Sequence, residues 1–111
     1  MAKNSQYLYI IRPTRLEMLT EGPTEREQKI VSQHFTYLQD LTQQGVAILV
    51  GRSQTADADS LGIIVYQASS EETARRLMEN DPAVKQGVMR ASFYPFRIAL
   101  ITADTSDFLS T

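Results

Sequence analysis

The order of its secondary-structure signals constrains the fold of this chain more than any other feature. Four apolar runs of strand length occupy residues 6–12, 46–50, 61–67 and 88–101. An amphipathic helix pattern over residues 24–45 separates the first two runs, and a second pattern over residues 70–80 separates the last two. The middle runs are joined by residues 51–53 and the short polar loop 54–60, and so short a connection favours an antiparallel hairpin.

This order predicts an α+β fold. Right-handed crossovers on strand, helix, strand, strand, helix, strand give a four-stranded antiparallel sheet with both helices on one face. The other face of the sheet would then be apolar and bare, and the same face of a second copy is its simplest cover. We therefore expect a homodimer with two sheets face to face, a closed α/β barrel.

The length of 111 residues fits one domain over residues 1–111. We expect its core over about residues 6–101, followed by a polar tail over residues 102–111. Pro95 interrupts the last apolar run, and proline cannot donate a hydrogen bond to a sheet. The last strand should therefore lie at an edge of the sheet or contain a bulge.

The helix ends also carry signals. Thr24 and Glu27 have the spacing of a capping box, and Gly45 is well placed to end the first helix. Ser69 and Glu72 repeat the capping-box spacing at the start of the second helix pattern. Both helices should therefore begin and end where the sequence pattern does.

Composition excludes several classes of function. The formal net charge is -2 and no basic run occurs, so binding to nucleic acid by phosphate neutralisation is not expected. The absence of cysteine excludes disulfides, thiolate catalysis and thiolate metal sites. The first apolar run is too short for a signal peptide or a membrane span, so we expect a cytoplasmic protein without membrane contact.

The only histidine, His34, lies on the apolar side of the long helix pattern. It shares that side with Ile30, Tyr37, Leu38 and Leu41. An ordinary imidazole has a pKa of about 6.5, which suits proton transfer near neutral pH. The alternative is a core histidine whose ring nitrogens bond to neighbouring hydroxyl or backbone groups, and the pattern alone leaves both interpretations open.

Asp81 precedes Pro82 and on pattern alone is a helix cap and turn former. Its position after the second helix places it on the same side of the sheet as the first helix. A carboxylate there could orient the His34 ring and fix its tautomer, as in a catalytic dyad. His34 and Asp81 are therefore the candidate catalytic pair.

Polar side chains at the strand ends are candidate substrate-binding groups. Arg12, Arg52 and Ser53 could hold a carboxylate or enolate by charge-assisted hydrogen bonds. The alternative is that arginines at strand ends are simply solvated. The glycine spacing matches no nucleotide-binding motif, and one histidine without cysteine cannot form a usual zinc site, so no cofactor or metal is expected.

The arrangement resembles the YCII-related family. The resemblance lies in His34 ahead of the pair Tyr37-Leu38, in Gly45 before an apolar strand that reaches Gly51, and in the later pair Asp81-Pro82. It implies ferredoxin-like subunits in a dimeric α/β barrel, with a site on His34 and Asp81. The chemistry known for the family is acid/base dehydrochlorination of a chlorinated hydroxyquinol.

Two positions depart from the family pattern. Ala83 stands where a bulky aromatic commonly follows the proline, and Arg52 stands where a proline often follows the second glycine. Both departures would reshape the pocket. The first hypothesis is thus a cofactor-independent lyase or isomerase acting on a small cyclic or aromatic anion. The second is a non-catalytic dimeric module that binds a small ligand or a partner protein, and an enzyme of a sister barrel family is supported less well.

Overall fold

The computed structural model of the protein describes residues 4–109. Its elements are β1 (Ser5–Pro13), α1 (Glu17–Thr20), α2 (Glu25–Gln43), β2 (Ala47–Arg52), β3 (Gly62–Ala68), α3 (Glu71–Glu79), α4 (Pro82–Lys85) and β4 (Met89–Phe96). The first three residues of the expected domain and the last two of the expected tail lie outside the described residues. No helix within the described part is long and apolar enough to cross a membrane.

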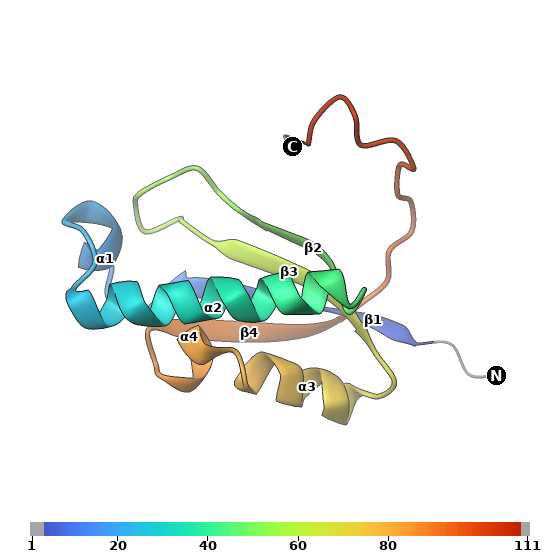
Figure 1. The fold of residues 1–111 in the computed structure, drawn as a ribbon, viewed down its shortest axis with the longest axis horizontal. Coiled ribbons are helices and arrows are strands. Elements are labelled where there is room, and N and C mark those ends of the chain that lie inside the picture. Colours follow the sequence, from blue (N-terminus) through green and yellow to red (C-terminus); the bar gives the residue numbers. More distant parts are fainter. Residues whose placement is uncertain (1–3, 110–111) are drawn as a thin grey trace.

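The four strands form one antiparallel sheet in the order β2-β3-β1-β4. Helices α2 and α3 lie side by side over one face of this sheet, as Figure 1 shows. The predicted α+β, ferredoxin-like βαββαβ arrangement is therefore confirmed. β4 lies at an edge, where Pro95 is tolerated because its missing N–H is not needed on the open side.

The core lies between the sheet and the helices. Alternate residues of the two central strands point to the helix side, and they are buried there: Tyr7, Tyr9, Ile11, Ile64, Tyr66 and Ala68. Leu38 from α2 and Ala74 and Met78 from α3 close this core. The buried face of α3 is narrow, but it is sufficient because the sheet supplies most of the large side chains.

The other sheet face, which we call the outer face, is left open to solvent. It carries the remaining residues of the same alternation, among them Leu8, Ile10, Leu49, Ile63, Tyr94 and Phe96. Leu49 is 49% exposed and Tyr94 is 45% exposed. The uncovered apolar face expected from the topology is therefore present in the single chain.

Helix α2 begins and ends where the sequence signals at Thr24 and Gly45 predict. The Thr24 hydroxyl accepts from the Glu27 N–H at 3.1 Å, and the Thr24 N–H donates to the Glu27 carboxylate at 2.8 Å. Gly45 has a φ of 76°, which places it in the left-handed region that favours glycine. Its N–H donates to the carbonyl of Thr42, and the next N–H donates to that of Leu41, which together end α2.

Three boundaries differ most clearly from expectation. β2 ends at Arg52 rather than at Val50. Ser70, not Ser69, caps α3 by accepting from the Thr73 N–H at 3.1 Å, because Ser69 still belongs to the bend after β3. The last strand ends at Phe96 rather than at residue 101. Its pairing with β1 stops at Gln6, whose side-chain Oε1 accepts the Ile98 N–H at 3.0 Å. Residues 97–109 therefore extend away from the body, with Leu100 94% exposed (Figure 1).

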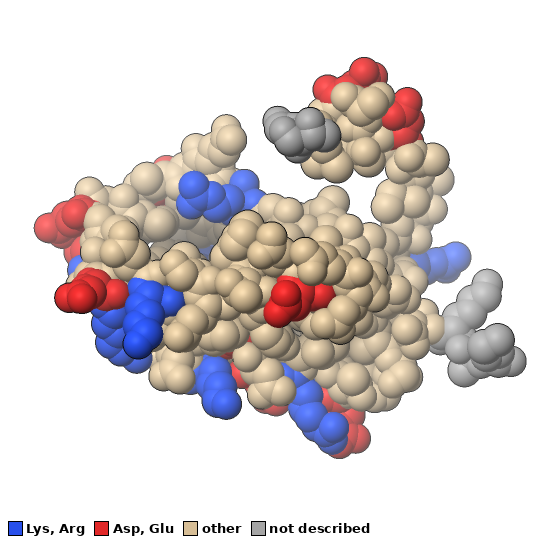
Figure 2. Space-filling view, in the orientation of Figure 1, with Lys and Arg blue, Asp and Glu red and all other residues tan. Residues whose placement is uncertain are grey.

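Charged side chains form no broad patch of one sign on the face shown in Figure 2. Acidic and basic groups are interspersed around its edges, and uncharged atoms cover most of the helix layer. No continuous basic stripe is visible on this face.

Candidate functional site

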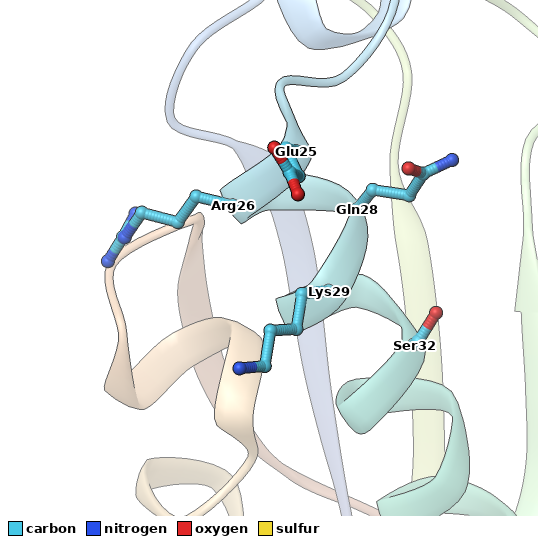
Figure 3. A pocket seen from close by; sticks show the side chains of 5 residues that line it. All are labelled: Glu25, Arg26, Gln28, Lys29 and Ser32. Carbon is cyan, nitrogen blue, oxygen red and sulfur yellow. The ribbon is translucent and has the colours of Figure 1, made fainter.

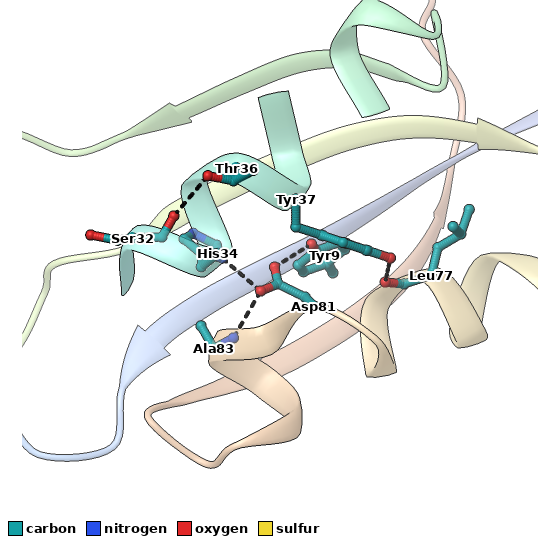
Figure 4. Close-up of polar contacts among 8 residues, drawn as sticks. All are labelled: Tyr9, Ser32, His34, Thr36, Tyr37, Leu77, Asp81 and Ala83. Atoms are coloured by element: carbon teal, nitrogen blue, oxygen red, sulfur yellow. Dashed lines mark hydrogen bonds and ion pairs between the residues drawn. The ribbon is translucent and has the colours of Figure 1, made fainter. Parts of the chain in front are cut away.

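His34 projects from the middle of α2 toward the start of α4 (Figure 4). Its side chain is 12% exposed, and its Nδ1 atom lies 2.6 Å from Oδ1 of Asp81. The helix pattern places His34 on the same side as the buried residues Leu38 and Leu41. The structure therefore brings the two candidate catalytic residues into direct contact.

Asp81 is fully buried and caps α4. Its Oδ1 atom accepts the Ala83 N–H at 3.0 Å in addition to its contact with His34, and its Oδ2 atom accepts the Tyr9 hydroxyl at 2.7 Å. A buried carboxylate is costly unless donors surround it. Three donors from three separate elements meet this requirement here.

The surroundings of Asp81 fix which nitrogen of His34 carries the proton. An ionised carboxylate can only accept, so Nδ1 must donate to it. Neutral His34 then has Nε2 unprotonated, and this nitrogen has no hydrogen-bond partner among residues 4–109. An imidazole held in this way can accept a proton at Nε2 while the carboxylate stabilises the resulting cation.

Two tyrosines close to Asp81 stay protonated. Burial, and then the nearby Asp81 charge, raises the pKa of Tyr9 far above its usual range. The same two causes raise the pKa of Tyr37 to about 12. The Tyr37 hydroxyl donates to the Leu77 carbonyl at 2.6 Å rather than to Asp81. Of these two tyrosines, Tyr9 therefore supplies Asp81 with its phenolic donor.

A cavity of about 450 Å³ opens beside His34 between α2 and the ends of β1, β2 and β3. Its walls are mostly apolar: Ile11, Leu19, Val31, Phe35, Leu38, Val50, Ile64 and Met89. Gly62 forms part of the floor, where a Cβ atom would lie 2.9 Å from Cγ1 of Ile11. The volume and lining suit a small ring compound.

The cavity also receives Arg52 and Ser53 but not Arg12. A bulge between Ala47 and Leu49 shifts the alternation of β2, so Arg52 pairs with Gly62 on the helix side of the sheet. Arg12 follows the core residue Ile11 without a bulge and therefore lies on the outer face. In the single chain Arg12 therefore lies on the opposite sheet face from Arg52, and its role in substrate binding stays a prediction.

The hydroxyl of Ser53 is already used within its own loop. It accepts the Leu61 N–H at 3.0 Å and contacts the Thr55 hydroxyl at 2.9 Å. Arg52 forms no ion pair among the described residues. Arg52 is therefore the better placed of the two to meet an anionic ligand, and Ser53 mainly shapes the loop beside it.

A second depression lies on the solvent side of α2. Figure 3 shows that its polar side chains fan out from the first turns of the helix, with no common focus. They are Glu25, Arg26, Gln28, Lys29 and Ser32. Within residues 4–109, no three acidic or histidine side chains converge in a way that could hold a metal ion.

Sequence reasoning missed the role of Tyr9 as a donor to Asp81. Tyr9 looks like any aromatic residue of a buried strand, and nothing in the pattern points to a partner 72 positions away. The cap predicted at Asp81 is confirmed by the Ala83 N–H, because a capping aspartate commonly accepts from the second or third residue that follows it.

Comparison with known proteins places these features in context. The sequence model of the family described as YCII-related domain matches residues 6–96. Among solved structures, 5-chloro-2-hydroxyhydroquinone dehydrochlorinase from Burkholderia phenoliruptrix AC1100, in complex with 2,5-dihydroxybenzoquinone, is similar with a TM-score of 0.59 and 18% identity. The alignment covers 82% of this chain and 93% of the dehydrochlorinase, and at this identity it establishes the fold alone. No protein of curated function matches the sequence.

Proposed function

The chain belongs to the YCII-related domain family, and we propose that it is a cofactor-independent acid/base enzyme. Its substrate would be a small cyclic or aromatic anion, and its reaction a lyase or isomerase reaction. The observation that carries this proposal is the contact of 2.6 Å between Nδ1 of His34 and Oδ1 of Asp81 beside a cavity.

The proposed chemistry uses His34 as the proton carrier. Nε2 takes a proton from a carbon or hydroxyl of the ligand, and the Asp81 carboxylate stabilises the imidazolium that forms. In an isomerisation the proton returns to another atom of the same ligand. In an elimination the electron pair of the broken C–H or O–H bond forms a new double bond while an anionic leaving group departs.

The cavity supports a ring-shaped anion as ligand. Its apolar walls would cover the faces of a ring, and the guanidinium of Arg52 would neutralise a carboxylate or enolate. The ligand named with the similar dehydrochlorinase, 2,5-dihydroxybenzoquinone, is a six-membered ring with ionisable hydroxyl groups. A compound of that kind is a suitable first probe for this chain.

We also propose that the protein is a homodimer formed through its outer face. Leu49, Tyr94 and Phe96 are between 41% and 49% exposed, and they are contiguous with Leu8, Ile10 and Ile63 through the pairing of the strands. An apolar face of this extent is rarely left in water. A two-fold axis would bury it against itself and give the barrel that the topology predicts.

The alternative function is a non-catalytic module that binds the same class of ligand. It is favoured by one observation, the use of the Ser53 hydroxyl in its own loop, which leaves Arg52 and His34 as the main polar groups toward the cavity. Such a module would bind a ring anion without moving a proton.

Exchange of ligand protons with solvent distinguishes the two functions even while the product is unidentified. The protein is incubated in deuterium oxide with a panel of hydroxylated quinones, hydroxybenzoates and chlorinated hydroxyquinols, and each compound is followed by mass spectrometry. With the wild type, at least one of these compounds should incorporate deuterium or be converted to a product. Replacing His34 by Asn should lower that rate by about 10²–10⁴-fold.

The matched control is Gln33→Asn, which introduces the same side chain at the neighbouring exposed position of α2. It should exchange at the wild-type rate. Equal exchange in His34→Asn and in the control would overturn the role of His34 as proton carrier. Binding of a ligand without exchange or turnover in the wild type would instead support the ligand-binding module.

A further inference from the structure

Tyr9 is a buried hydroxyl that the proposed proton transfer does not itself use. It lies at the centre of β1, where it pairs with Ile64 of β3 and Phe93 of β4. Its side chain is 1% exposed, and its ring meets that of Tyr66 edge to face, with centroids 5.5 Å apart. The ring is therefore packed on every side, and its hydroxyl cannot turn to water.

The two oxygens of Asp81 have different partners. Oδ1 accepts from His34 and from the Ala83 N–H, whereas Oδ2 accepts from Tyr9 alone among the described residues (Figure 4). Hydrogen bonds to both oxygens therefore oppose rotation of the carboxylate. Without the Tyr9 hydroxyl, Oδ2 would be a buried charged oxygen with no donor, which is among the costliest arrangements in a protein interior.

We propose that Tyr9 is a positioning residue, whose hydroxyl holds the Asp81 carboxylate ionised and oriented so that the proton of neutral His34 stays on Nδ1. Loss of this donor leaves Asp81 two ways to satisfy Oδ2. It can rotate away from Nδ1, or it can take up a proton. Rotation removes the acceptor that selects the His34 tautomer, and a proton on Oδ2 weakens it because Oδ1 is then neutral. In both cases the preference for an unprotonated Nε2 decreases.

The chain contains its own control for this idea. Tyr37 also lies beside the site and is partly buried, whereas Tyr9 is fully buried, and the Tyr37 hydroxyl donates to the Leu77 carbonyl and not to Asp81. Loss of that hydroxyl should weaken packing between α2 and α3 without affecting the carboxylate. Tyr37→Phe therefore removes the same atom as Tyr9→Phe from the same neighbourhood and leaves the proposed chain of hydrogen bonds intact.

The effect of this positioning role on catalysis rests on the proposed function. The role itself can be tested separately, because the tautomer of His34 can be measured without a substrate. His34 is the only histidine of the protein, so nitrogen-15 NMR of labelled protein gives a single pair of imidazole signals. While the ring is neutral, the wild type and Tyr37→Phe should show Nδ1 protonated and Nε2 unprotonated. Tyr9→Phe should shift the ratio of the two tautomers by about tenfold or more, as expected when a hydrogen bond to a charged group is lost.

A double substitution tests whether Tyr9 acts through Asp81. In an Asp81→Asn background the further change Tyr9→Phe should leave the His34 signals where they are, because the acceptor has already lost its charge. A wild-type tautomer ratio in Tyr9→Phe would overturn the proposal. So would an equal shift in Tyr37→Phe, which would assign the effect to packing alone.

Tyr9→Phe removes a buried donor and can weaken folding. If the variant is unfolded in buffer, both it and the wild type are measured in trimethylamine N-oxide, which favours the compact state. A Tyr9→Phe chain that stays unfolded there, while Tyr37→Phe folds, would contradict the positioning role and make Tyr9 a structural residue. Failure of deuterium exchange in the wild type would count against the proposed enzyme and not against the tautomer result.

Discussion

Nδ1 of His34 and Oδ1 of Asp81 lie 2.6 Å apart although the two residues are separated by 47 positions in the chain. The contact joins the middle of α2 to the first turn of α4, and the sheet underneath contributes the Tyr9 hydroxyl. Because each partner sits on a different element, the geometry of the pair depends on the packing of the whole layer. The site therefore responds to changes both within it and in the elements that support it.

The charge of Asp81 should matter more than its shape. Asn at this position can still cap α4 and contact Tyr9, but a neutral amide stabilises an imidazolium poorly and does not select the Nδ1–H tautomer. Asp81→Asn should therefore lower any His34-dependent exchange or turnover by about 10³–10⁴-fold. The rate is measured on a responsive compound, with Asp40→Asn on the exposed side of α2 as control. A rate within a few-fold of wild type would refute the dyad.

Acid should weaken the connection between Arg15 and α2. Hydrogen bonds from Arg15, then from the Thr24 backbone, lower the pKa of Glu27 from 4.5 to about 2. The unfolded carboxyl therefore takes up its proton at a higher pH than the folded one. Its contribution to stability is complete above pH 4.5 and is lost as the pH falls toward about 2.

The stability difference between the wild type and Glu27→Gln should accordingly be larger at about pH 6 than at about pH 3. Urea unfolding at the two pH values measures it, and Glu25→Gln in the exposed first turn serves as the reference. A difference that stays constant with pH would show that the Glu27 carboxylate does not contribute through its charge.

A charge on the outer face should prevent dimer formation. Leu49 is half exposed in the single chain, and an arginine there would be buried without a partner in a face-to-face dimer. Light scattering after size exclusion should give a dimer for the wild type and a monomer for Leu49→Arg. Gln39→Arg adds the same charge on the helix side and should remain a dimer. Monomeric wild type at micromolar concentration would contradict the proposed assembly.

The floor of the cavity should not tolerate a methyl group at Gly62. A Cβ atom there would lie 2.9 Å from Cγ1 and 3.2 Å from Cδ1 of Ile11, a core side chain with little room to move. Gly62→Ala should destabilise the protein by about 1–3 kcal/mol, the usual cost of overpacking. Gly51→Ala, on the neighbouring strand, meets nothing within 4 Å in the single chain and should destabilise the protein less than Gly62→Ala does. Similar effects of the two substitutions in denaturant titrations would argue against this close contact.

Much of the fold follows from local signals in the sequence. The capping box at Thr24 and the glycine stop at Gly45 define α2, because each depends on residues within one or two turns. The order of strands and helices then leaves few topologies, and the observed one is among them. The extent of the last strand could not be predicted in this way, since a strand continues only while a neighbour pairs with it.

The sequence by itself determined that His34 lies on the buried side of a helix and that Asp81 begins the turn after the second helix. Only the tertiary structure decided that His34 and Asp81 meet and that the Tyr9 hydroxyl donates to the Asp81 carboxylate. It also decided that Arg52 rather than Arg12 reaches the cavity. The last choice depends on one extra residue, the bulge after Ala47, which reverses the faces of the rest of β2. Local patterns fix periodicity within an element, whereas the register between elements and the packing of their faces decide which side chains come together.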